Sequence, residues 1–459
     1  MARWPRYKQS DGLAEATAMT EVSKRGFMGA GAAAALAAAF SPAAVAAGVA
    51  SDWSVPASLQ QEMYAKALQI ARSKVRGGPG DPAYPKPFVD AAFSAHIFVW
   101  DTCFIAAYAK YHPDVLPIAN ALDNFYQRQD ADGFICREYD EKGRPFWPKD
   151  HPVSINPPLF AFAELELYGR SHDAARLRAV YPTLTRFFDF LMRTYRAADG
   201  LFFSDALGSG MDNIPRYPAG WSDDGKGIAL HNLYPAVFDY KGASAEWNRQ
   251  GRSVDFSAQM ALFADQLAQI ARLIGRGADA SRHAAAHDDI ARAINLHCWD
   301  ETEGFYFDQG YGKPIRQKHV GMFWTLWAGV APPEWRRRLL LHLIDTDEFW
   351  RTIPVATFSA DQPLFAPEGN YWLGSVWAPT NYMVLRGLER IGERALAVQL
   401  ARRYYWAVAQ VYKATGTFWE NYAPDSVAKG SIARGDFCGW TGLVPIAIYR
   451  EYINPQPST

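Results

Sequence analysis

The chain has 459 residues, of which 49% are hydrophobic and 14% aromatic, and its formal net charge is −1. This composition supplies a large buried core and excludes a disordered or fibrous protein. Its balanced charges argue against a surface for nucleic acid, which needs clustered Lys and Arg. The 16 Trp and 23 Tyr residues are many for one chain; such rings form flat platforms in sugar-binding clefts, and they also fill plain helical cores.

The first fifty residues (1–50) predict an export signal and an N-terminal tail. Ser23–Met28 contains Lys24 and Arg25, an Ala-rich stretch runs to Phe40, and Ala44–Ala46 offers a small-residue cleavage site. A positive region, a short apolar region and a small-x-small end are typical of a signal peptide, and the apolar region is too short to span a bilayer. Ser-Lys-Arg-x-Phe resembles a twin-arginine signal with Lys in place of the first Arg. We therefore expect a periplasmic or secreted protein; the alternative is an ordinary Ala-rich helix.

Helices are predicted one after another through the rest of the chain. Apolar residues recur at steps of three and four along Phe263–Ile274 and along residues 174–195, which places one apolar stripe on one face of each helix. Asp173 precedes the second stretch as a candidate N-cap, and Gly200 lies beyond its end. Twelve helices are predicted in all, at residues 58–76, 101–111, 114–128, 158–169, 174–195, 263–274, 278–297, 318–330, 333–345, 375–392, 394–413 and 439–453.

Few strands are predicted. Gly200–Phe203 and Gly304–Asp308 are expected to form small hairpins or extended edges, and no Pro- or Ser-rich linker interrupts the helices. We therefore predict one all-α domain over residues 51–459. Long irregular stretches exceed the usual helix connection of about two to eight residues and are expected to build the binding site. These stretches are residues 129–157, 199–250, 346–374 and 414–438.

Four motifs rich in aromatic and carboxyl side chains lie near these stretches. They are, in chain order, Trp100–Phe104 (WDTCF), Ser209–Arg216 (SGMDNIPR), Tyr371–Trp377 (YWLGSVW) and Trp419–Tyr422 (WENY), the last followed by Gly439–Thr441 (GWT). Together they resemble the glycoside hydrolases of family 63, especially the short prokaryotic mannosylglycerate and glucosylglycerate hydrolases, and the related trehalases of family 37.

The resemblance runs from about Pro87 to the C-terminus, and it includes Asn156-Pro157-Pro158 and Asp255 with Gln259. It implies an (α/α)6 toroid or barrel of six inner and six outer helices, with the long loops forming the active site at one end. It also implies hydrolysis of an α-glycoside with inversion, which releases glucose or mannose from a small α-linked glycoside or oligosaccharide. Trehalose is an alternative substrate. The chain departs from the family's usual Tyr-Trp-Arg-Gly at Leu373, and it lacks the glycine-rich cluster of trehalases.

Two carboxyl groups with opposite duties are needed for inversion. One hands a proton to the leaving oxygen, and the other takes a proton from water on the opposite face of the sugar, about 6.5–9.5 Å away. Asp212 lies in a Gly-flanked loop and is the predicted general acid; the alternative is a loop Asp that bonds backbone amides. Glu420, among aromatic residues, is the predicted general base. A surface Glu is the alternative reading of Glu420, and Glu368 is the rival base.

Other residues of the matched motifs are predicted to bind the sugar. Asp101 would hold sugar hydroxyls from the start of an inner helix, although an N-cap is a common role for Asp at such a place. The aromatic side chains among these residues either form platforms for the sugar or belong to the ordinary core. The predicted substrate-binding residues are Trp100, Asp101, Phe104, Asn156, Asn213, Arg216, Tyr371, Trp372, Trp377 and Trp440.

The sequence predicts no metal site and no cofactor. Cys103, Cys136, Cys298 and Cys438 have no metal-ligand spacing and are expected to be buried thiols. His283 and His287 are four residues apart but lack the Glu of a zinc-binding helix. The expected partner is a small carbohydrate, with no nucleic acid and no membrane span in the mature chain.

Two other classes of function stay open at this point. A sugar epimerase or isomerase uses paired histidines on the same kind of barrel, and His231 and His319 lie near suitable loops. A binding protein would hold a sugar without cleaving it. The ordered Asp and Glu motifs favour hydrolysis over both.

Overall fold

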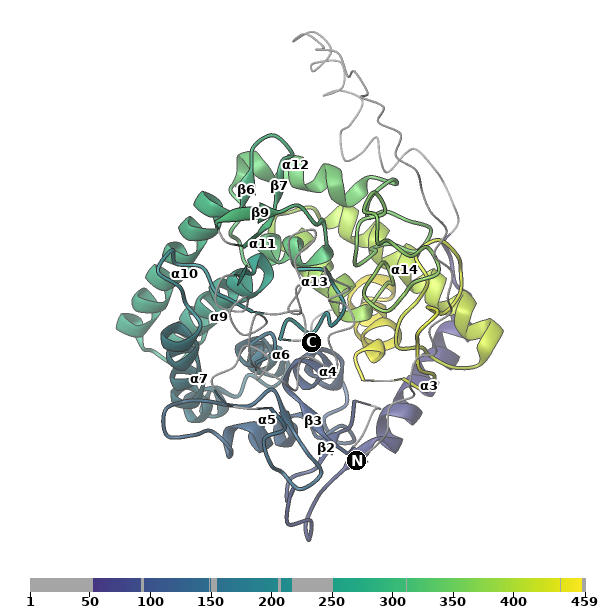
Figure 1. Ribbon diagram of the computed structural model, residues 1–459. Coiled ribbons are helices and arrows are strands. Elements are labelled where there is room, and N and C mark those ends of the chain that lie inside the picture. Colours follow the sequence, from purple (N-terminus) through teal and green to yellow (C-terminus); the bar gives the residue numbers. More distant parts are fainter. Residues whose placement is uncertain are drawn as a thin grey trace, which may run out of the picture. The chain divides into compact units, whose positions relative to one another are not determined.

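Helices dominate the part of the chain that the structure describes. This computed structural model describes residues 53–91, 95–147, 149, 155–204, 208–216, 251–310, 312–437 and 439–455 (Figure 1). By its internal contacts Ser51–Thr459 is one compact unit, separate from Met1–Ala50.

A helix lies at each of the twelve predicted places. The α-helices are α3 (Ala57–Ser73), α4 (Val99–Ala109), α5 (Ile118–Tyr126), α6 (Phe160–Ser171), α7 (Ala174–Thr194), α9 (Val254–Leu273), α10 (Gly277–His297), α11 (Trp324–Trp327), α12 (Pro333–Ile344), α13 (Ala378–Arg390) and α14 (Arg394–Thr415). Two 3₁₀ turns, η3 (Val320–Phe323) and η4 (Thr441–Leu443), precede α11 and the last helix, η5 (Val444–Ile453).

Helix ends follow local chemistry. The Asp173 carboxylate accepts the Ala175 and Arg176 N–H groups at 2.9 and 3.1 Å, so the predicted N-cap of α7 is confirmed. α5 begins at residue 118 rather than 114, directly after Pro117. The last helix is a π-helix rather than the predicted α-helix.

Strands are short and antiparallel. β1 (Val75–Arg76) pairs with β2 (Phe88–Val89), β3 (Ile97–Phe98) with β4 (Glu138–Tyr139), β6 (Trp299–Asp300) with β7 (Phe305–Tyr306), and β8 (Asp308–Gly310) lies between β5 (Gly251–Arg252) and β9 (Lys313–Ile315). The pairing of β6 with β7 confirms the predicted hairpin near Gly304. The pairing of β3 with β4 matters most, because β3 leads directly into α4.

The helices differ in how much of their length is buried. Every residue of α4 is buried, and α9 and α13 are buried along most of their length. By contrast, α12 buries only Leu339 and Leu343. In Figure 1 α4, α6, α11 and α13 lie toward the middle of this unit, and α3, α10, α12 and α14 lie toward its rim. This contrast is largest between α4, which is buried throughout, and α12, which buries two residues.

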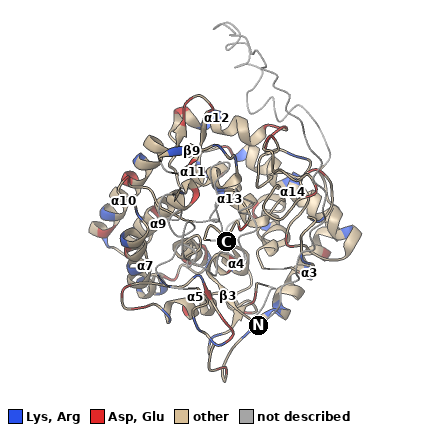
Figure 2. Cartoon of the chain, in the orientation of Figure 1, with Lys and Arg blue, Asp and Glu red and all other residues tan. Residues whose placement is uncertain are grey.

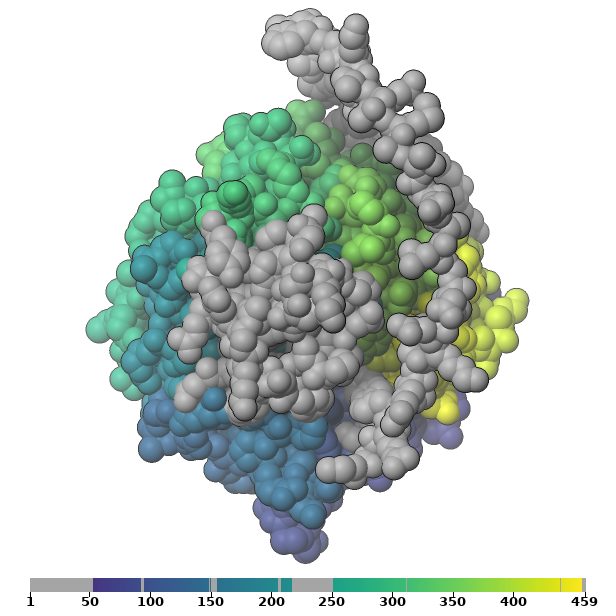
Figure 3. All heavy atoms as spheres, in the orientation of Figure 1, coloured from purple at the N-terminus to yellow at the C-terminus, as the bar shows by residue number. Residues whose placement is uncertain are grey.

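Contacts between neighbouring helices run through the whole unit. α4 packs on α5 and α6, α6 on α7 and α9, α9 on α10 and α11, α11 on α13, and α13 on α14. The last helix, η5, contacts α14, α3 and α4. Figure 3 shows the same relation at the surface, where the yellow C-terminal residues lie against purple residues from the start of the described chain.

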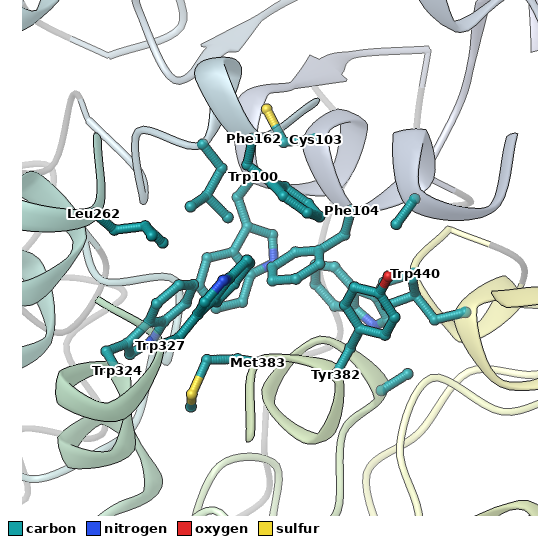
Figure 4. Close-up of a cluster of buried hydrophobic side chains, with 14 of the residues drawn as sticks. Trp100, Cys103, Phe104, Phe162, Leu262, Trp324, Trp327, Tyr382, Met383 and Trp440 are labelled. Atoms are coloured by element: carbon teal, nitrogen blue, oxygen red, sulfur yellow. The ribbon is translucent and has the colours of Figure 1, made fainter. Parts of the chain in front are cut away.

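Aromatic side chains fill the space between the central helices. Figure 4 shows side chains from α4, α6, α9, α11 and α13 pointing toward one another, with Trp440 beside them. Phe104 lies here, fully buried, with its ring centroid 6.2 Å from that of Phe162. Trp324 and Trp327 stack with centroids 5.1 Å apart. The core therefore reaches up to the first turn of α4, which contains Asp101, the second residue of the first motif.

An ionic cluster joins four central elements at the other end of α4. Lys110 binds Glu166 of α6 and lies 2.9 Å from Glu451 of η5. Arg386 of α13 lies 3.3 Å from Glu166, and the Tyr382 hydroxyl donates to Glu451 at 3.0 Å. Burial raises the pKa of Glu166, but the charges of Lys110 and Arg386 outweigh this and hold it below its usual value. This cluster is roughly 14 Å along the helix axis from Asp101, so it stabilises the scaffold and leaves the site end free for chemistry.

Charged residues on the outer helices carry both signs. Figure 2 shows Lys and Arg interspersed with Asp and Glu over α7, α10 and α12. Cys103, Cys136 and Cys298 are buried free thiols, as predicted, and Cys438 lies outside the described residues. Among the helices described, none is both long and apolar enough to cross a membrane.

Candidate active site

Asp101 lies in the first turn of α4, buried at its inner side. The helix begins at Val99, whose N–H donates to the Arg137 carbonyl at 2.9 Å, so Asp101 is inside the helix and the N-cap reading is wrong. Its Oδ1 is buried without a hydrogen-bond partner. Burial raises its pKa well above the usual value; the Arg137 charge opposes this rise, whereas Glu138 and Glu420 add to it. Asp101 therefore offers an acceptor that solvent does not satisfy.

Glu420 is held between two extended segments. Its N–H donates to the Arg434 carbonyl at 2.9 Å, and the Arg434 N–H donates back to its Oε2 at 3.3 Å. On the other side, Tyr422 and Val376 exchange backbone hydrogen bonds of 2.8 and 3.0 Å. The side chain is only 2% exposed, so the surface reading of this residue is wrong, and Oε1 is buried without a partner.

Burial raises the pKa of Glu420 to about 7. The Arg434 charge and its N–H lower the pKa in part, and the Asp212 charge raises it. Asp212 and Glu420 are thus within electrostatic reach of each other, as Asp101 and Glu420 are. The structure brings the three predicted carboxyls into one neighbourhood.

Asn213 fixes the loop that carries Asp212. Its Oδ1 accepts the Trp372 N–H at 2.8 Å, and its Nδ2 donates to the Asn370 carbonyl at 3.1 Å. Asn156 reaches the same loop, with Nδ2 3.4 Å from the Gly208 carbonyl. The second and third motifs are therefore bonded to each other, which places Asp212 beside the aromatic segment at 371–377.

Arg216 anchors the end of this loop. Its guanidinium binds both oxygens of Asp255 on α9 and lies 2.8 Å from Asp308 on β8. Asp308 in turn accepts the Val254 N–H at 2.7 Å and contacts His319 at 3.2 Å. Arg216 is 3% exposed and binds two carboxylates, so its ion pairs fix the position of the loop that carries Asp212. Its predicted contact with substrate stays a prediction.

Four tryptophans form a continuous group beside the carboxyls. Trp372 and Trp377 stack with centroids 3.9 Å apart and planes at 4°, and Trp100 meets Trp372 and Trp440 edge-on at 6.1 Å. Trp377 Nε1 donates to the Tyr371 carbonyl. By contrast, the buried Nε1 donors of Trp100 and Trp372 have no partner, so these two indoles can donate to a sugar.

A glycine permits the close approach of this group to the Asp212 loop. Gly210 has φ of 80°, and a Cβ at that position would lie 3.1 Å from the Trp100 ring. Any larger residue would push the loop away from Trp100. The glycine of the SGMD motif is thereby explained.

The rival base is not favoured by its surroundings. Glu368 is exposed, so it lacks the desolvation that acts on Glu420. Leu373, at the departure from the family motif, is buried. Residues 205, 221, 223 and 224, which lie near Asp212 in the sequence, are outside the described residues.

Histidines have other duties in the described part of the chain. His283 contacts the Tyr181 hydroxyl at 3.1 Å, and burial lowers its pKa to about 4. His287 bonds to the Ala328 carbonyl and to Asp288. His319 faces Asp308, and His231 lies outside the described residues.

Two arginines of the site were not predicted from the sequence. Arg137 is buried, lies over the Trp147 ring at 4.6 Å and acts on Asp101. Arg434 acts on Glu420. No sequence spacing predicts the role of either arginine. Their only indication in the sequence is that each lies in a long loop that also carries motif residues.

A groove elsewhere does not compete for this role. It has a volume of about 690 Å³ between α5 and α7, and it is lined by Lys86, Asp123 and Arg176 among others. Lys86 and Asp123 pair at 2.6 Å, and Arg176 binds the buried Glu164 at 2.8 Å. Their charges are already compensated, so the groove offers no free chemistry.

A family model decides the class of this protein. The model for the mannosylglycerate hydrolase MGH1-like glycoside hydrolase domain matches residues 94–441, which include all four motifs. The chain belongs to this family. It is therefore an O-glycosyl hydrolase. Membership of this family favours hydrolysis over the epimerase and the sugar-binding protein.

Relatives of this glycoside hydrolase agree on the class. It is 24% identical to the mannosylglycerate hydrolase of Rubrobacter radiotolerans over 81% of this chain and 92% of the relative. It is 23% identical to the periplasmic trehalase of Pseudomonas aeruginosa over 80% of this chain and 71% of the relative. The solved GH63 mannosylglycerate hydrolase of Thermus thermophilus, in complex with glucose, superposes with a TM-score of 0.64 at 21% identity over 83% of this chain and 99% of that one. That likeness shows a shared fold.

Replacing Arg216 tests whether it anchors the hydrolase. Arg216→Met leaves Asp255 and Asp308 buried without their cation, so we expect the free energy of unfolding to fall by about 3–5 kcal/mol. Urea or thermal unfolding measures the change, with Arg196→Met, whose partner Asp289 is half exposed, as the matched control. Unchanged stability with a raised KM would mean that Arg216 acts on substrate instead.

The buried carboxyl of Glu420 should lower the free energy of unfolding at neutral pH. A carboxyl whose pKa is raised from 4.5 to about 7 keeps its proton in the folded state after the unfolded chain has lost it. Its contribution therefore falls as pH rises across that window. We expect Glu420→Gln to be more stable than wild type by about 3 kcal/mol at about pH 8, and the difference to vanish below about pH 4.

Unfolding measured across that pH range checks this expectation. The exposed Glu368 supplies the control, because Glu368→Gln should leave stability unchanged throughout. A Glu420→Gln variant that tracks the wild type at every pH would contradict a desolvated Glu420.

Proposed function

We propose that this hydrolase is an exported, inverting α-glycosidase in which Asp212 is the general acid and Glu420 the general base. The observation that carries the proposal is the state of Glu420. Its carboxyl is buried, its pKa is about 7, and Oε1 has no partner beside two other carboxyls. A carboxyl tuned near neutral pH is suited to proton transfer at that pH.

Each carboxyl has one task in this mechanism. Asp212 donates its proton to the glycosidic oxygen as the bond to the anomeric carbon breaks. A water molecule attacks that carbon from the opposite face, and its proton passes to Glu420. The backbone N–H of Arg434 bonds Oε2, so Oε1 is the oxygen left to receive the proton. Inversion then needs a gap of about 6.5–9.5 Å between the carboxyls for that water.

Buried polar atoms without partners supply the sugar contacts. Asp101 Oδ1 is an acceptor, and the Nε1 atoms of Trp100 and Trp372 are donors. Leaving such groups unpaired costs about 1–3 kcal/mol each, so a sugar hydroxyl that pairs with them recovers that free energy. Trp377 and Asn213 hold Trp372 in place, while Phe104 lies deeper, in the core.

The scaffold is inferred to be an (α/α)6 barrel within a single catalytic domain, residues 51–459. The alternation of buried and one-sided helices and the contacts of η5 with α3 and α4 support this arrangement. Residues 1–50 are inferred to be an export signal, and similarity to a periplasmic trehalase is compatible with export. We therefore place the enzyme in the periplasm or outside the cell.

A small glycoside of glucose or mannose is the proposed substrate class. The similarity to a mannosylglycerate hydrolase, which covers 92% of that relative, favours a short aglycone. Trehalose is the second candidate, because periplasmic trehalases match over similar lengths of this chain. Release of free sugar from mannosylglycerate, glucosylglycerate, trehalose, kojibiose, nigerose and maltose separates these substrates.

Two carboxamide variants test the assignment of roles on whichever substrate is cleaved. Asp212→Asn and Glu420→Gln each remove one proton-transfer step, so we expect turnover to fall about 100- to 10,000-fold. The far-ultraviolet circular dichroism of both variants should match the wild type. Glu368→Gln is the control and should keep full activity. Normal turnover in either of the first two variants would remove that residue from the mechanism.

A further inference from the structure

No step of the proposed mechanism uses His319, a buried histidine that directly precedes η3. Its Nε2 lies 3.2 Å from Oδ2 of Asp308, and Arg216 donates to the same oxygen at 2.8 Å. Burial raises the pKa of Asp308, but the Arg216 charge and the His319 contact outweigh this and hold it below its usual value. A carboxylate only accepts hydrogen bonds, so the Nε2–H group is the donor. One oxygen of Asp308 thus joins His319 to Arg216, at the end of the described loop that carries Asp212 (residues 208–216).

A glycine lets the His319 ring approach these ion pairs. A Cβ at Gly321 would lie 2.8 Å from His319 Nδ1 and 3.0 Å from Oδ2 of Asp255. Asp255 is the second carboxylate that Arg216 binds. Nδ1 is buried without a hydrogen-bond partner, so in the described part of the chain the ring bonds through Nε2. The ring is therefore held between Asp308 and the backbone at residue 321, and one side-chain hydrogen bond links it to the anchor of the loop.

The backbone of His319 belongs to a row of extended segments that leads to Glu420. His319 forms an antiparallel bridge with Phe358. From the first segment to the last, the hydrogen bonds are Val320 N–H to the Thr357 carbonyl at 2.9 Å, Thr357 N–H to the Ser375 carbonyl at 3.2 Å, and the pair of bonds between Val376 and Tyr422 at 2.8 and 3.0 Å. Tyr422 is two residues after Glu420. His319 therefore has its side chain on the anchor of the acid and its backbone in the framework of the base.

We propose that His319 is a positioning residue that fixes the loop of Asp212 relative to Glu420, because its side chain holds the ion pairs of that loop and its backbone lies in the framework of the base. This inference rests on the function proposed above. Inversion needs a gap of about 6.5–9.5 Å between the two carboxyls, and a misplacement of about 1 Å can lower turnover about 100-fold. A hydrogen bond that fixes one carboxyl relative to the other therefore controls the rate.

Removing this hydrogen bond should impair the step that the general acid performs. His319→Leu fills the same buried space but leaves Asp308 without its second donor, so the loop of Asp212 is free to shift. We expect turnover of the preferred α-glycoside to fall about 100-fold. The α-glycosyl fluoride of the same sugar should lose much less, because fluoride leaves the anomeric carbon without a proton from an acid.

Three companion variants separate positioning from stability. His319→Gln puts an amide N–H near the position of Nε2 and should restore most of the turnover, whereas Gly321→Ala pushes the ring away from Asp308 and should reproduce the selective loss. His283→Leu is the matched control. His283 is a buried histidine whose Nε2 contacts the Tyr181 hydroxyl at 3.1 Å and whose Nδ1 also has no partner. Its replacement should lower stability and leave the ratio of the two rates unchanged.

Hydrogen exchange in the peptide that spans residues 208–216 reports on the loop without turnover. Its protected groups include the N–H of Met211, which bonds to Ser209 at 3.1 Å, and the N–H of Ile214, which bonds to the Met211 carbonyl at 3.0 Å. Mass spectrometry should find faster exchange of this peptide in His319→Leu and Gly321→Ala than in the wild type. Exchange in His319→Gln and His283→Leu should match the wild type.

The two measurements together decide the proposal. A loss confined to the glycoside, with faster exchange at residues 208–216, supports it. An equal loss on both substrates, unchanged exchange in His319→Leu, or the same selective loss in His283→Leu overturns it. If His319→Leu does not fold, the comparison of Gly321→Ala with His319→Gln gives the answer. If the wild type cleaves neither the glycoside nor the fluoride, the proposed hydrolysis fails, and hydrogen exchange decides whether His319 anchors the loop.

Discussion

Desolvation of carboxyl groups is the constraint around which this molecule is arranged. Glu420 and Asp101 are buried, and the charge of Asp212 raises the pKa of Glu420. A carboxylate taken from water loses free energy unless hydrogen bonds or cations replace its solvent. Here the replacement is partial: Glu420 Oε2 has a donor, while Oε1 and one oxygen of Asp101 have none. The unsatisfied atoms are the ones that water and sugar hydroxyls would use.

The surrounding scaffold makes this arrangement stable. Arg216 ties the Asp212 loop to α9 and β8 through fully paired carboxylates, and Asn213 ties it to the aromatic segment. At the far end of α4, Lys110 and Glu451 join central helices by paired charges. These scaffold carboxylates are therefore paired, whereas Glu420 Oε1 and Asp101 Oδ1 at the site are buried without partners.

Local features of the fold were accessible from sequence, and long-range pairing was not. Periodicity placed all twelve helices, and Asp173 caps α7 as its position predicted. Glu420 was assigned to the site by its motif, but its desolvation was not predicted. The partners of Arg216 lie 39 and 92 residues away, a distance that no local pattern encodes. Arg434 was missed for the same reason: its effect depends on a loop returning to Glu420 fourteen residues later.

In the proposed mechanism, two differently protonated carboxyls act on opposite faces of the sugar. The most direct test is proton NMR of the anomeric signals during the first turnovers on the preferred α-linked substrate. With inversion, the β-anomer of the released sugar appears first and then mutarotates to the equilibrium mixture. Initial release of the α-anomer would contradict it, because retention requires a carboxylate nucleophile rather than a base with a water molecule.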